Sequence, residues 1–202
     1  MKKLTKNNDI SALVLSGGQS RRMQGIDKGL IKLAGKPMIQ YLLDSLNTHI
    51  SNILISTNSS NPAYKSFNYP LIADLLPGGL GPLAGIHAGL SACNTQYLLV
   101  TPCDSPFLNT QLCERLIEAL AKQHTKIAVA HDGERIQSTF VLIDKQLTNS
   151  LSSYLNRGGR RLITWLKEEK AVEVDCSDYK KSFTNINTIS ELNLAENTII
   201  TK

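Results

Sequence analysis

Short apolar runs alternate with longer amphipathic stretches along the first two-thirds of the chain. The short runs are rich in Leu, Ile and Val, which favours strands buried in a sheet, and they lie at 11–15, 52–57, 71–73, 97–101 and 126–130. The amphipathic stretches have the pattern of helices with one buried face, and they lie at 38–48, 83–92 and 110–123. This alternation predicts a three-layer, Rossmann-like α/β fold, in which helices cover both faces of a mostly parallel central sheet.

The pattern becomes less regular after residue 138. Strands are expected at 139–143 and 171–174, and helices at 146–155, 161–169 and 190–194. The chain contains no repeat, low-complexity tract or linker, so we predict a single domain over residues 1–202. The polar residues 1–9 and the segment 196–202 are expected to be loosely ordered ends.

The predicted parallel strands end at glycine or polar residues. These residues are Gly17 with Gly18, then Asn58, Asp74 and Asp104. Ligands of open α/β sheets bind beyond the carboxyl ends of the strands. We therefore expect the four strand ends to outline one cleft.

Composition narrows the class of protein. The chain has 202 residues, is 42% hydrophobic and 19% charged, and carries a formal net charge of +5. These values are ordinary for a globular enzyme, and the positive charge favours an anionic partner. Nucleic acid is disfavoured because no long run of Lys and Arg occurs and aromatic residues make up only 5% of the chain.

The four cysteines and the first residues of the chain indicate the cellular compartment of the protein. The cysteines form no Cys-x-x-Cys pair, and no histidine lies near them at a spacing suited to a metal. The polar start lacks the apolar region of a signal peptide, and no apolar run is long enough to span a membrane. We expect a cytoplasmic protein with reduced thiols and no membrane contact.

The loop after the first strand has the character of a phosphate-binding site. Gly17 and Gly18 can adopt positive φ and let a ligand approach the main chain, and Arg21, Arg22 and Lys28 supply positive charge. Neither the Walker pattern nor the dinucleotide pattern Gly-x-Gly-x-x-Gly occurs here. The sequence therefore predicts a long loop that wraps a polyphosphate without a helix beginning at once.

Asp104 follows a buried strand and lies between two prolines that stiffen its loop. A carboxylate at this edge, opposite a phosphate loop, is where Mg²⁺ would bridge protein and polyphosphate. Taken alone, Asp104 fits a turn or a helix cap as well as it fits a metal site. The glycine loop upstream favours the role of a metal ligand.

A second glycine-rich loop follows Asp74 and contains Gly78, Gly79, Gly81 and Gly85. A planar base could lie against this backbone. Asp74 could accept hydrogen bonds from the exocyclic amine and ring N–H that guanine presents and adenine does not. A simple turn leading into a helix that starts at a proline explains the same sequence.

The first loop resembles the signature of the nucleotidyltransferases that build molybdenum cofactor, and among them most closely the guanylyltransferase family. The matching residues are Leu15, Ser16, Gly17, Gly18, Ser20, Arg22, Met23, Gly25, Asp27 and Lys28. Ser16 and Gln24 depart from the alanine and glycine that are usual there. In this family Gly18, with the second glycine loop, goes with GTP, whereas the relatives that use CTP tend to have alanine.

The resemblance extends to about residue 193 and implies roles for further residues. Ser56 aligns with an asparagine of the nucleotide pocket, and Asn58 is a second candidate that a turn would also explain. Arg161, Asn185 and Asn187 match the acceptor side, although Asn187 could simply cap the last helix. Residues 10–130 would thus bind nucleotide and 131–195 the acceptor.

The predicted site therefore combines residues that bind nucleotide, metal and acceptor. Catalysis is assigned to Arg22, Lys28 and Asp104, and Asp104 is also the Mg²⁺ ligand. The nucleotide-binding set comprises Leu15, Ser16, Gly17, Gly18, Lys28, Ser56, Asn58, Asp74, Gly81 and Asp104. The acceptor set comprises Arg161, Asn185 and Asn187.

The resemblance implies transfer of GMP from GTP to the terminal phosphate of molybdopterin, with or without molybdenum, and release of pyrophosphate. It also implies exchange of the pterin with a molybdenum insertion enzyme and with apo-molybdoenzymes. Two alternatives stay open: a nucleotidyltransferase that uses CTP or a sugar phosphate, and a regulatory module that binds GTP without turnover.

Overall fold

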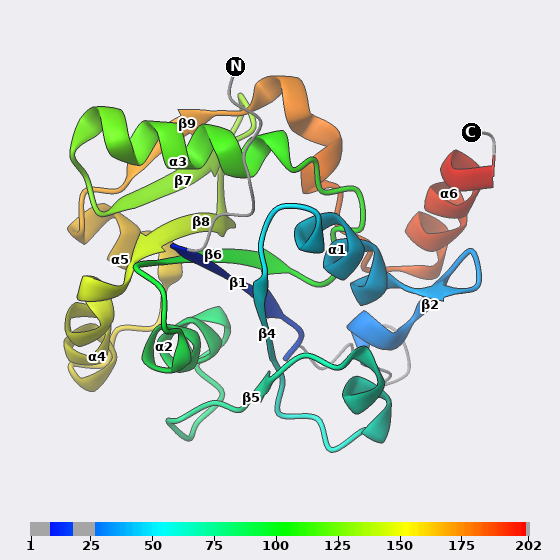
Figure 1. Cartoon of the computed structure of the whole chain (residues 1–202), viewed down its shortest axis with the longest axis horizontal. Helices are drawn as coiled ribbons and strands as arrows, with labels where there is room; N and C mark the ends of the chain where they lie inside the picture. Colours follow the sequence, from blue (N-terminus) through cyan, green and yellow to red (C-terminus); the bar gives the residue numbers. More distant parts are fainter. Residues whose placement is uncertain (1–8, 18–26, 201–202) are drawn as a thin grey trace.

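Seven strands form one sheet in the computed structural model, which describes residues 9–17 and 27–200 (Figure 1). The strand order is β5-β4-β1-β6-β8-β7-β9. The strands are β1 (Ile10–Leu15), β4 (Asn52–Ser56), β5 (Leu71–Ile72), β6 (Tyr97–Pro102), β7 (Ile127–His131), β8 (Ile136–Asp144) and β9 (Val172–Asp175). β8 runs antiparallel to both of its neighbours, and the other pairings are parallel. The predicted α/β fold with a mostly parallel sheet is confirmed.

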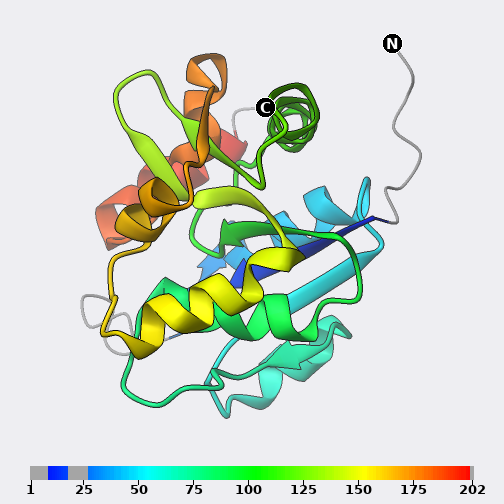
Figure 2. The ribbon, with the colours of Figure 1, turned by 90° about the vertical axis from the view of Figure 1, so that its left-hand side faces the viewer.

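Helices cover both faces of this sheet, as Figures 1 and 2 show. One face packs against α1 (Met38–Asn47) and α3 (Gln111–Gln123). The other packs against α2 (Pro82–Ala92), α4 (Thr148–Asn156) and α5 (Leu162–Glu168). The central strands therefore bury side chains on both faces, which explains their continuous apolar sequences.

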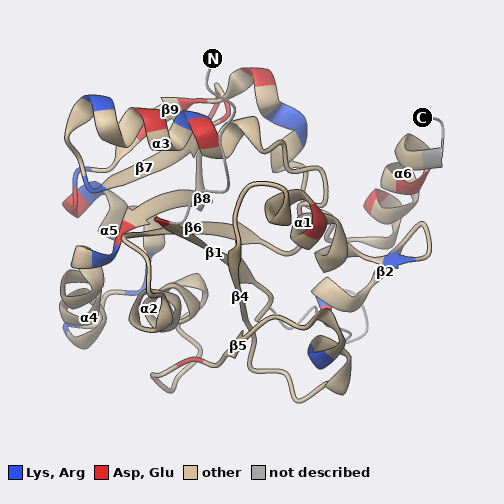
Figure 3. Cartoon of the chain, in the orientation of Figure 1, with Lys and Arg blue, Asp and Glu red and all other residues tan. Residues whose placement is uncertain are grey.

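β1 illustrates this two-sided burial. Ala12 and Val14 belong to the core on the α1 and α3 side, whereas Leu13 belongs to the core on the opposite side. All three side chains are fully buried. β1, β4 and β6 carry no charged residue, while charged residues lie on the surrounding helices and loops (Figure 3).

The end of the chain differs from its prediction. Helix α6 spans Ile189–Ile200, so the expectation of a short helix at 190–194 and a loose segment from residue 196 is wrong for residues 196–200. Ala195 of α6 joins a small core with Leu33 and Met38. Glu196 accepts a hydrogen bond from the backbone N–H of Ala34 at 2.8 Å. These contacts stabilise the second half of the helix, and they come from residues far away in the sequence.

Several short elements were not predicted. They are the hairpin of β2 (Lys32–Leu33) and β3 (Lys36–Pro37), and the 3-10 segments η2 (Lys28–Leu30), η3 (Pro62–Phe67) and η5 (Ser177–Phe183). The 3-10 segment η4 (Lys145–Leu147) overlaps the start of the helix predicted at 146–155. α6 lies beside β2 at the edge of the molecule in Figure 1. Among the helices of the described ranges, none is long and apolar enough to cross a membrane.

Candidate functional site

A cavity of about 1030 Å³ opens at the carboxyl ends of β1, β4 and β6, in front of the first turn of α2. The residues around it come from separate stretches of the chain, and one of them belongs to β8. They are Leu15, Ser16, Gly17, Asp27, Lys28, Ser56, Thr57, Asn58, Ser59, Ser60, Asp74, Gly79, Gly81, Pro82, Gly85, Pro102, Cys103, Asp104 and Thr139. The cleft expected from the strand ends is therefore present.

The floor of the cavity continues the hydrogen bonding of the central strands. The N–H of Ser16 donates to the carbonyl of Ser56 at 2.8 Å, and the N–H of Cys103 donates to the carbonyl of Leu15 at 3.0 Å. The Ser16 hydroxyl lies 2.7 Å from the Tyr64 hydroxyl, and both residues are buried. Burial raises the pKa of Tyr64 to about 12. The floor therefore keeps a neutral hydroxyl pair beneath the ligand space.

The glycines of the two loops behave differently. Gly17 does not use the positive φ that is open to glycine, and a side chain there would meet open space. Gly78, Gly79 and Gly81 do have positive φ, at 105°, 62° and 63°. Gly85 brings α2 against the strands, because a Cβ there would lie 2.4 Å from Ser56 Oγ. The second loop thus depends on the freedom of glycine more than the described part of the first.

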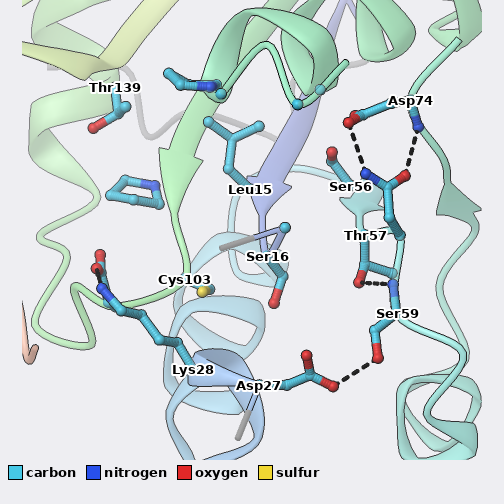
Figure 4. Close-up of a pocket in the computed structure, with 18 of the residues that line it drawn as sticks. Leu15, Ser16, Asp27, Lys28, Ser56, Thr57, Ser59, Asp74, Cys103 and Thr139 are labelled. Carbon is cyan, nitrogen blue, oxygen red and sulfur yellow. Dashed lines mark hydrogen bonds and ion pairs between the residues drawn. The ribbon is translucent and has the colours of Figure 1, made fainter. Parts of the chain in front are cut away.

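Asp74 and Asn58 form a closed pair at one side of the cavity. Asn58 Nδ2 donates to Asp74 Oδ2 at 2.7 Å. The backbone N–H of Asp74 donates to Asn58 Oδ1 at 2.9 Å. In Figure 4, Asp74 and Lys28 lie on opposite sides of Leu15 and Ser16. The cavity therefore has a carboxylate at one end and an ammonium at the other.

Lys28 lies between two oxygens at its end of the cavity. Its ammonium donates to Asp104 Oδ2 at 3.1 Å and to the side-chain oxygen of Asn187. The side chains of Lys28 and Asp104 are 22% and 14% exposed. The second carboxylate oxygen, Asp104 Oδ1, is buried and has no hydrogen-bond partner in the described part of the chain. A buried, unpaired carboxylate oxygen is costly unless a ligand completes it.

The segment that carries Asn185 and Asn187 lies against the Asp104 loop. The N–H of Ile186 donates to the carbonyl of Asp104 at 2.9 Å. The Ser105 hydroxyl donates to Asn185 Oδ1 at 2.5 Å. The structure thus brings both predicted acceptor asparagines to the loop of the predicted metal ligand, although neither lines the cavity itself.

Arg161, the third predicted acceptor residue, lies elsewhere. It precedes α5 with an exposed side chain, and its carbonyl accepts the Tyr154 hydroxyl at 3.0 Å. It is absent from the cavity lining, and its role stays a prediction. Gly18, Arg22 and Gln24 lie outside the described residues.

Some residues in or behind the cavity wall escaped the sequence analysis. Thr139 comes from the antiparallel strand β8, and Tyr64 reaches Ser16 from η3. Ser59 donates from its hydroxyl to Asp27 Oδ2 at 2.6 Å and so joins the β4 loop to the first loop. Asp27 belongs to the family signature in the first loop, so the sequence could have identified it as a site residue. The sequence around Tyr64 gave no such signal.

Comparisons with known proteins give a consistent result. The family model for the MobA-like NTP transferase domain matches residues 12–172. A protein of Ralstonia nicotianae named molybdenum cofactor guanylyltransferase is 42% identical over 194 residues, which cover 92% of this chain and 95% of that protein. A protein of Histophilus somni with the same name is 40% identical over 188 residues, covering 93% and 96%.

Solved structures show the same fold at lower identity. Molybdopterin-guanine dinucleotide biosynthesis protein A of Archaeoglobus fulgidus is similar with a TM-score of 0.77 and 23% identity, covering 95% of this chain and all of that one. A 2-C-methyl-D-erythritol 4-phosphate cytidylyltransferase of Thermus thermophilus is similar with a TM-score of 0.71 and 15% identity, covering 93% and 98%. One fold therefore accommodates different nucleotides.

Proposed function

The chain belongs to the family of MobA-like NTP transferases, and on this premise we propose that it transfers GMP from GTP to the terminal phosphate of molybdopterin. The family confirms the resemblance seen in the sequence and makes the chain a nucleotidyltransferase. The observation that carries the finer proposal is the cavity with Asp74 at one end and Lys28 with Asp104 at the other. This spacing of charge suits a nucleotide whose base and phosphates lie at opposite ends.

The base end supports a choice of guanine. The Asp74 carboxylate offers two acceptor oxygens to the ring N–H and the amine of guanine. Gly79 and Gly81, with their positive φ, leave bare backbone beside it for a planar ring. Relatives about 40% identical over most of the chain are named guanylyltransferases, which supports GTP over CTP.

The phosphate end supplies charge and position. The Lys28 ammonium would exchange its hydrogen bonds to Asp104 and Asn187 for bonds to the β- and γ-phosphates. It would then stabilise the leaving pyrophosphate. Arg22, the other cation proposed for this task, lies outside the described residues.

Asp104 fits a divalent cation because its buried Oδ1 is unpaired in the described structure. The described residues contain no group of three carboxylate, histidine or cysteine side chains that could hold a metal. This is compatible with Mg²⁺, which often binds one or two carboxylates together with substrate phosphates and water. Bound there, Mg²⁺ would neutralise phosphate charge. Asp104 would hold it.

The acceptor phosphate attacks the α-phosphorus of GTP in this proposal. A bond forms between a pterin phosphate oxygen and the α-phosphorus, and the bond to the β-phosphate bridging oxygen breaks. The nucleophile is already an anion at neutral pH, so no general base is required. Asn185 and Asn187 would help to place the acceptor beside Asp104.

The test is direct synthesis. The protein is incubated with GTP, Mg²⁺ and molybdopterin, and the guanine dinucleotide and pyrophosphate are measured, with CTP in a parallel reaction. We expect the Asp104→Asn variant to lose transfer by about 100-fold or more while keeping much of its GTP binding. Asp44→Asn is the matched control, because this exposed carboxylate on α1 pairs with Lys36 away from the cavity.

Equal use of GTP and CTP by the wild-type protein would contradict the guanine assignment. Unchanged transfer by Asp104→Asn would contradict the metal assignment. GTP binding without any product from molybdopterin would favour the regulatory alternative.

A further inference from the structure

We infer that Asn58 is a positioning residue for base selection, which fixes the Asp74 carboxylate so that it discriminates guanine from purines lacking the 2-amino group. The inference rests on the proposed function and assigns Asn58 an indirect role. The sequence had suggested that Asn58 contacts the nucleotide itself.

The pairing of the two residues carries this inference. Asn58 binds the side chain of Asp74 through Nδ2 and its backbone N–H through Oδ1, at 2.7 and 2.9 Å. The backbone N–H can only donate, so the atom facing it must be the amide oxygen. That orientation places the amide nitrogen toward the carboxylate. The direction of the Asn58 amide is therefore determined by its partners.

A fixed carboxylate matters because guanine presents two donors in one plane. The ring N–H and the 2-amino group can reach the two oxygens of a carboxylate only when its plane is aligned with the base. Asp74 follows the two-residue strand β5 and belongs to a partly exposed loop. A free carboxylate there would rotate, and ordering it on binding would cost conformational entropy. The bond from Asn58 Nδ2 to Oδ2 restricts this rotation in advance, and the bond from the Asp74 backbone N–H holds the amide that makes it.

Asn58 is itself held in place by its neighbours. Thr57 is 5% exposed, and its N–H donates to the carbonyl of Ile72 at 2.9 Å. The N–H of Ser59 donates to Thr57 Oγ1 at 3.1 Å. The Ser59 hydroxyl reaches Asp27 across the cavity wall (Figure 4). Asn58 therefore projects from a turn anchored on both sides.

The chemistry of the amide favours positioning over direct contact. Both polar atoms of the Asn58 side chain already bind Asp74, so contact with the base would compete with these bonds. An amide is also the suitable group for this task, because it offers a donor to the carboxylate and an acceptor to the N–H at once. An aspartate would fit the space but would place a second negative charge against Asp74.

The experiment compares GTP with inosine triphosphate, which differs from it by lacking the 2-amino group. Catalytic efficiency with molybdopterin and equilibrium binding in the presence of Mg²⁺ are measured for both nucleotides. The variants are Asn58→Ala, Asn58→Asp, Asp74→Asn and the double variant Asn58→Ala with Asp74→Asn. Asn61→Ala is the matched control, since Asn61 is an exposed asparagine that caps η3 and does not line the cavity.

We expect the wild-type protein to prefer GTP, and Asn58→Ala to reduce that preference by roughly fivefold to tenfold. Asn58→Asp should reduce it at least as much. In the Asp74→Asn background, Asn58→Ala should change the preference little, because the group it positions is gone. Asn61→Ala should keep the wild-type preference.

Two results would overturn the inference while leaving the proposed function intact. One is a wild-type preference that Asp74→Asn removes and Asn58→Ala keeps. The other is a loss in Asn58→Ala that affects GTP and inosine triphosphate equally, or that Asn61→Ala reproduces. A wild-type protein that shows no preference between the two nucleotides and also uses CTP equally would instead overturn the guanine assignment.

Discussion

Lys28 connects three parts of the chain through a single ammonium group. It contacts Asp104 after β6 and Asn187 before α6, and its own position follows the first loop. Half-burial strengthens this ion pair relative to one in open solvent. The same ammonium can bind the phosphates of a nucleotide, because phosphate oxygens accept hydrogen bonds as the oxygens of Asp104 and Asn187 do.

We expect Lys28→Ala to slow transfer by about 100-fold or more, since a cation that faces developing phosphate charge is lost. The measurement is the catalytic efficiency of pyrophosphate release. Lys36→Ala is the control, because Lys36 pairs with Asp44 at an exposed site. A wild-type rate in Lys28→Ala would remove Lys28 from the proposed machinery.

The buried hydroxyl pair of Ser16 and Tyr64 leads to a prediction about stability. Tyr64→Phe keeps the ring but leaves the Ser16 hydroxyl without this partner, so we expect a loss of about 1–2 kcal/mol in the free energy of unfolding. Ser16→Ala should lower the free energy of unfolding less in the Tyr64→Phe background than in the wild-type protein, because the partner hydroxyl is already absent there. Urea unfolding of the wild type, the two single variants and the double variant measures this coupling. Strictly additive losses would show that the two hydroxyls do not interact.

Site residues could be predicted where they follow a strand directly. Asp74 and Asp104 come just after β5 and β6, and the strand pattern placed them at one edge. Tyr64 could not be found, because it belongs to a 3-10 segment without strand or helix periodicity. Asn58 was found, but only coordinates could show that its amide turns toward Asp74.

The elements themselves were predictable where burial repeats along the chain. β1, β4 and β6 are mostly apolar and carry no charged residue, and their predicted ends agree with the structure to within one residue. The β2–β3 hairpin has two-residue strands, too short to leave a pattern. α6 was predicted too short because its apolar contacts depend on β2, which the sequence did not reveal.

The first turn of helix α6 orients Asn187. Glu191 Oε2 accepts the N–H groups of Asn187 and Thr188 at 2.7 and 2.9 Å, and Thr188 Oγ1 accepts the N–H of Glu191 at 3.2 Å. This is a capping box. The hydrogen bond from the Asn187 backbone lowers the pKa of Glu191, so the carboxylate remains charged at neutral pH.

We expect Glu191→Ala to lower the free energy of unfolding by about 1 kcal/mol and to reduce the turnover rate more than the affinity for GTP. The reason is that Asn187 loses its backbone anchor while Asp74 and the base end are untouched. Glu196→Ala is the matched control, because it removes a bond from α6 to Ala34 and none to Asn187. Equal effects of the two variants on turnover would mean that only the docking of α6 matters.

At the scale of the whole molecule, the site is assembled by the return of the C-terminal segment. The family match ends at residue 172, yet Asn187 meets Lys28 and Ile186 meets Asp104. Figure 3 shows basic and acidic residues interspersed along the described part of the chain. Lys28 is the cation that the described structure places at the cavity.

The core also makes the stability of the whole molecule depend on pH. Burial raises the pKa of Cys113 on α3 to about 12, and that of Cys103 to about 12. An unfolded chain ionises its thiols near pH 8.5. The folded state therefore holds more protons above that pH, and stability is fully present below about pH 8.5 and falls as pH rises toward 12.

We expect the free energy of unfolding to fall between pH 8 and pH 10.5, with each such thiol contributing up to about 1.4 kcal/mol per pH unit. Cys113→Ala should make the free energy of unfolding less dependent on pH, because the contribution of one thiol is lost. It also lowers stability at every pH, because it removes core volume. Leu116→Ala on the same helix is the control, because it opens a cavity in the same core without removing a titrating group. Denaturant unfolding at several pH values measures both slopes. If Cys113→Ala and Leu116→Ala keep the same slope as the wild-type protein, the alkaline loss must come from other groups.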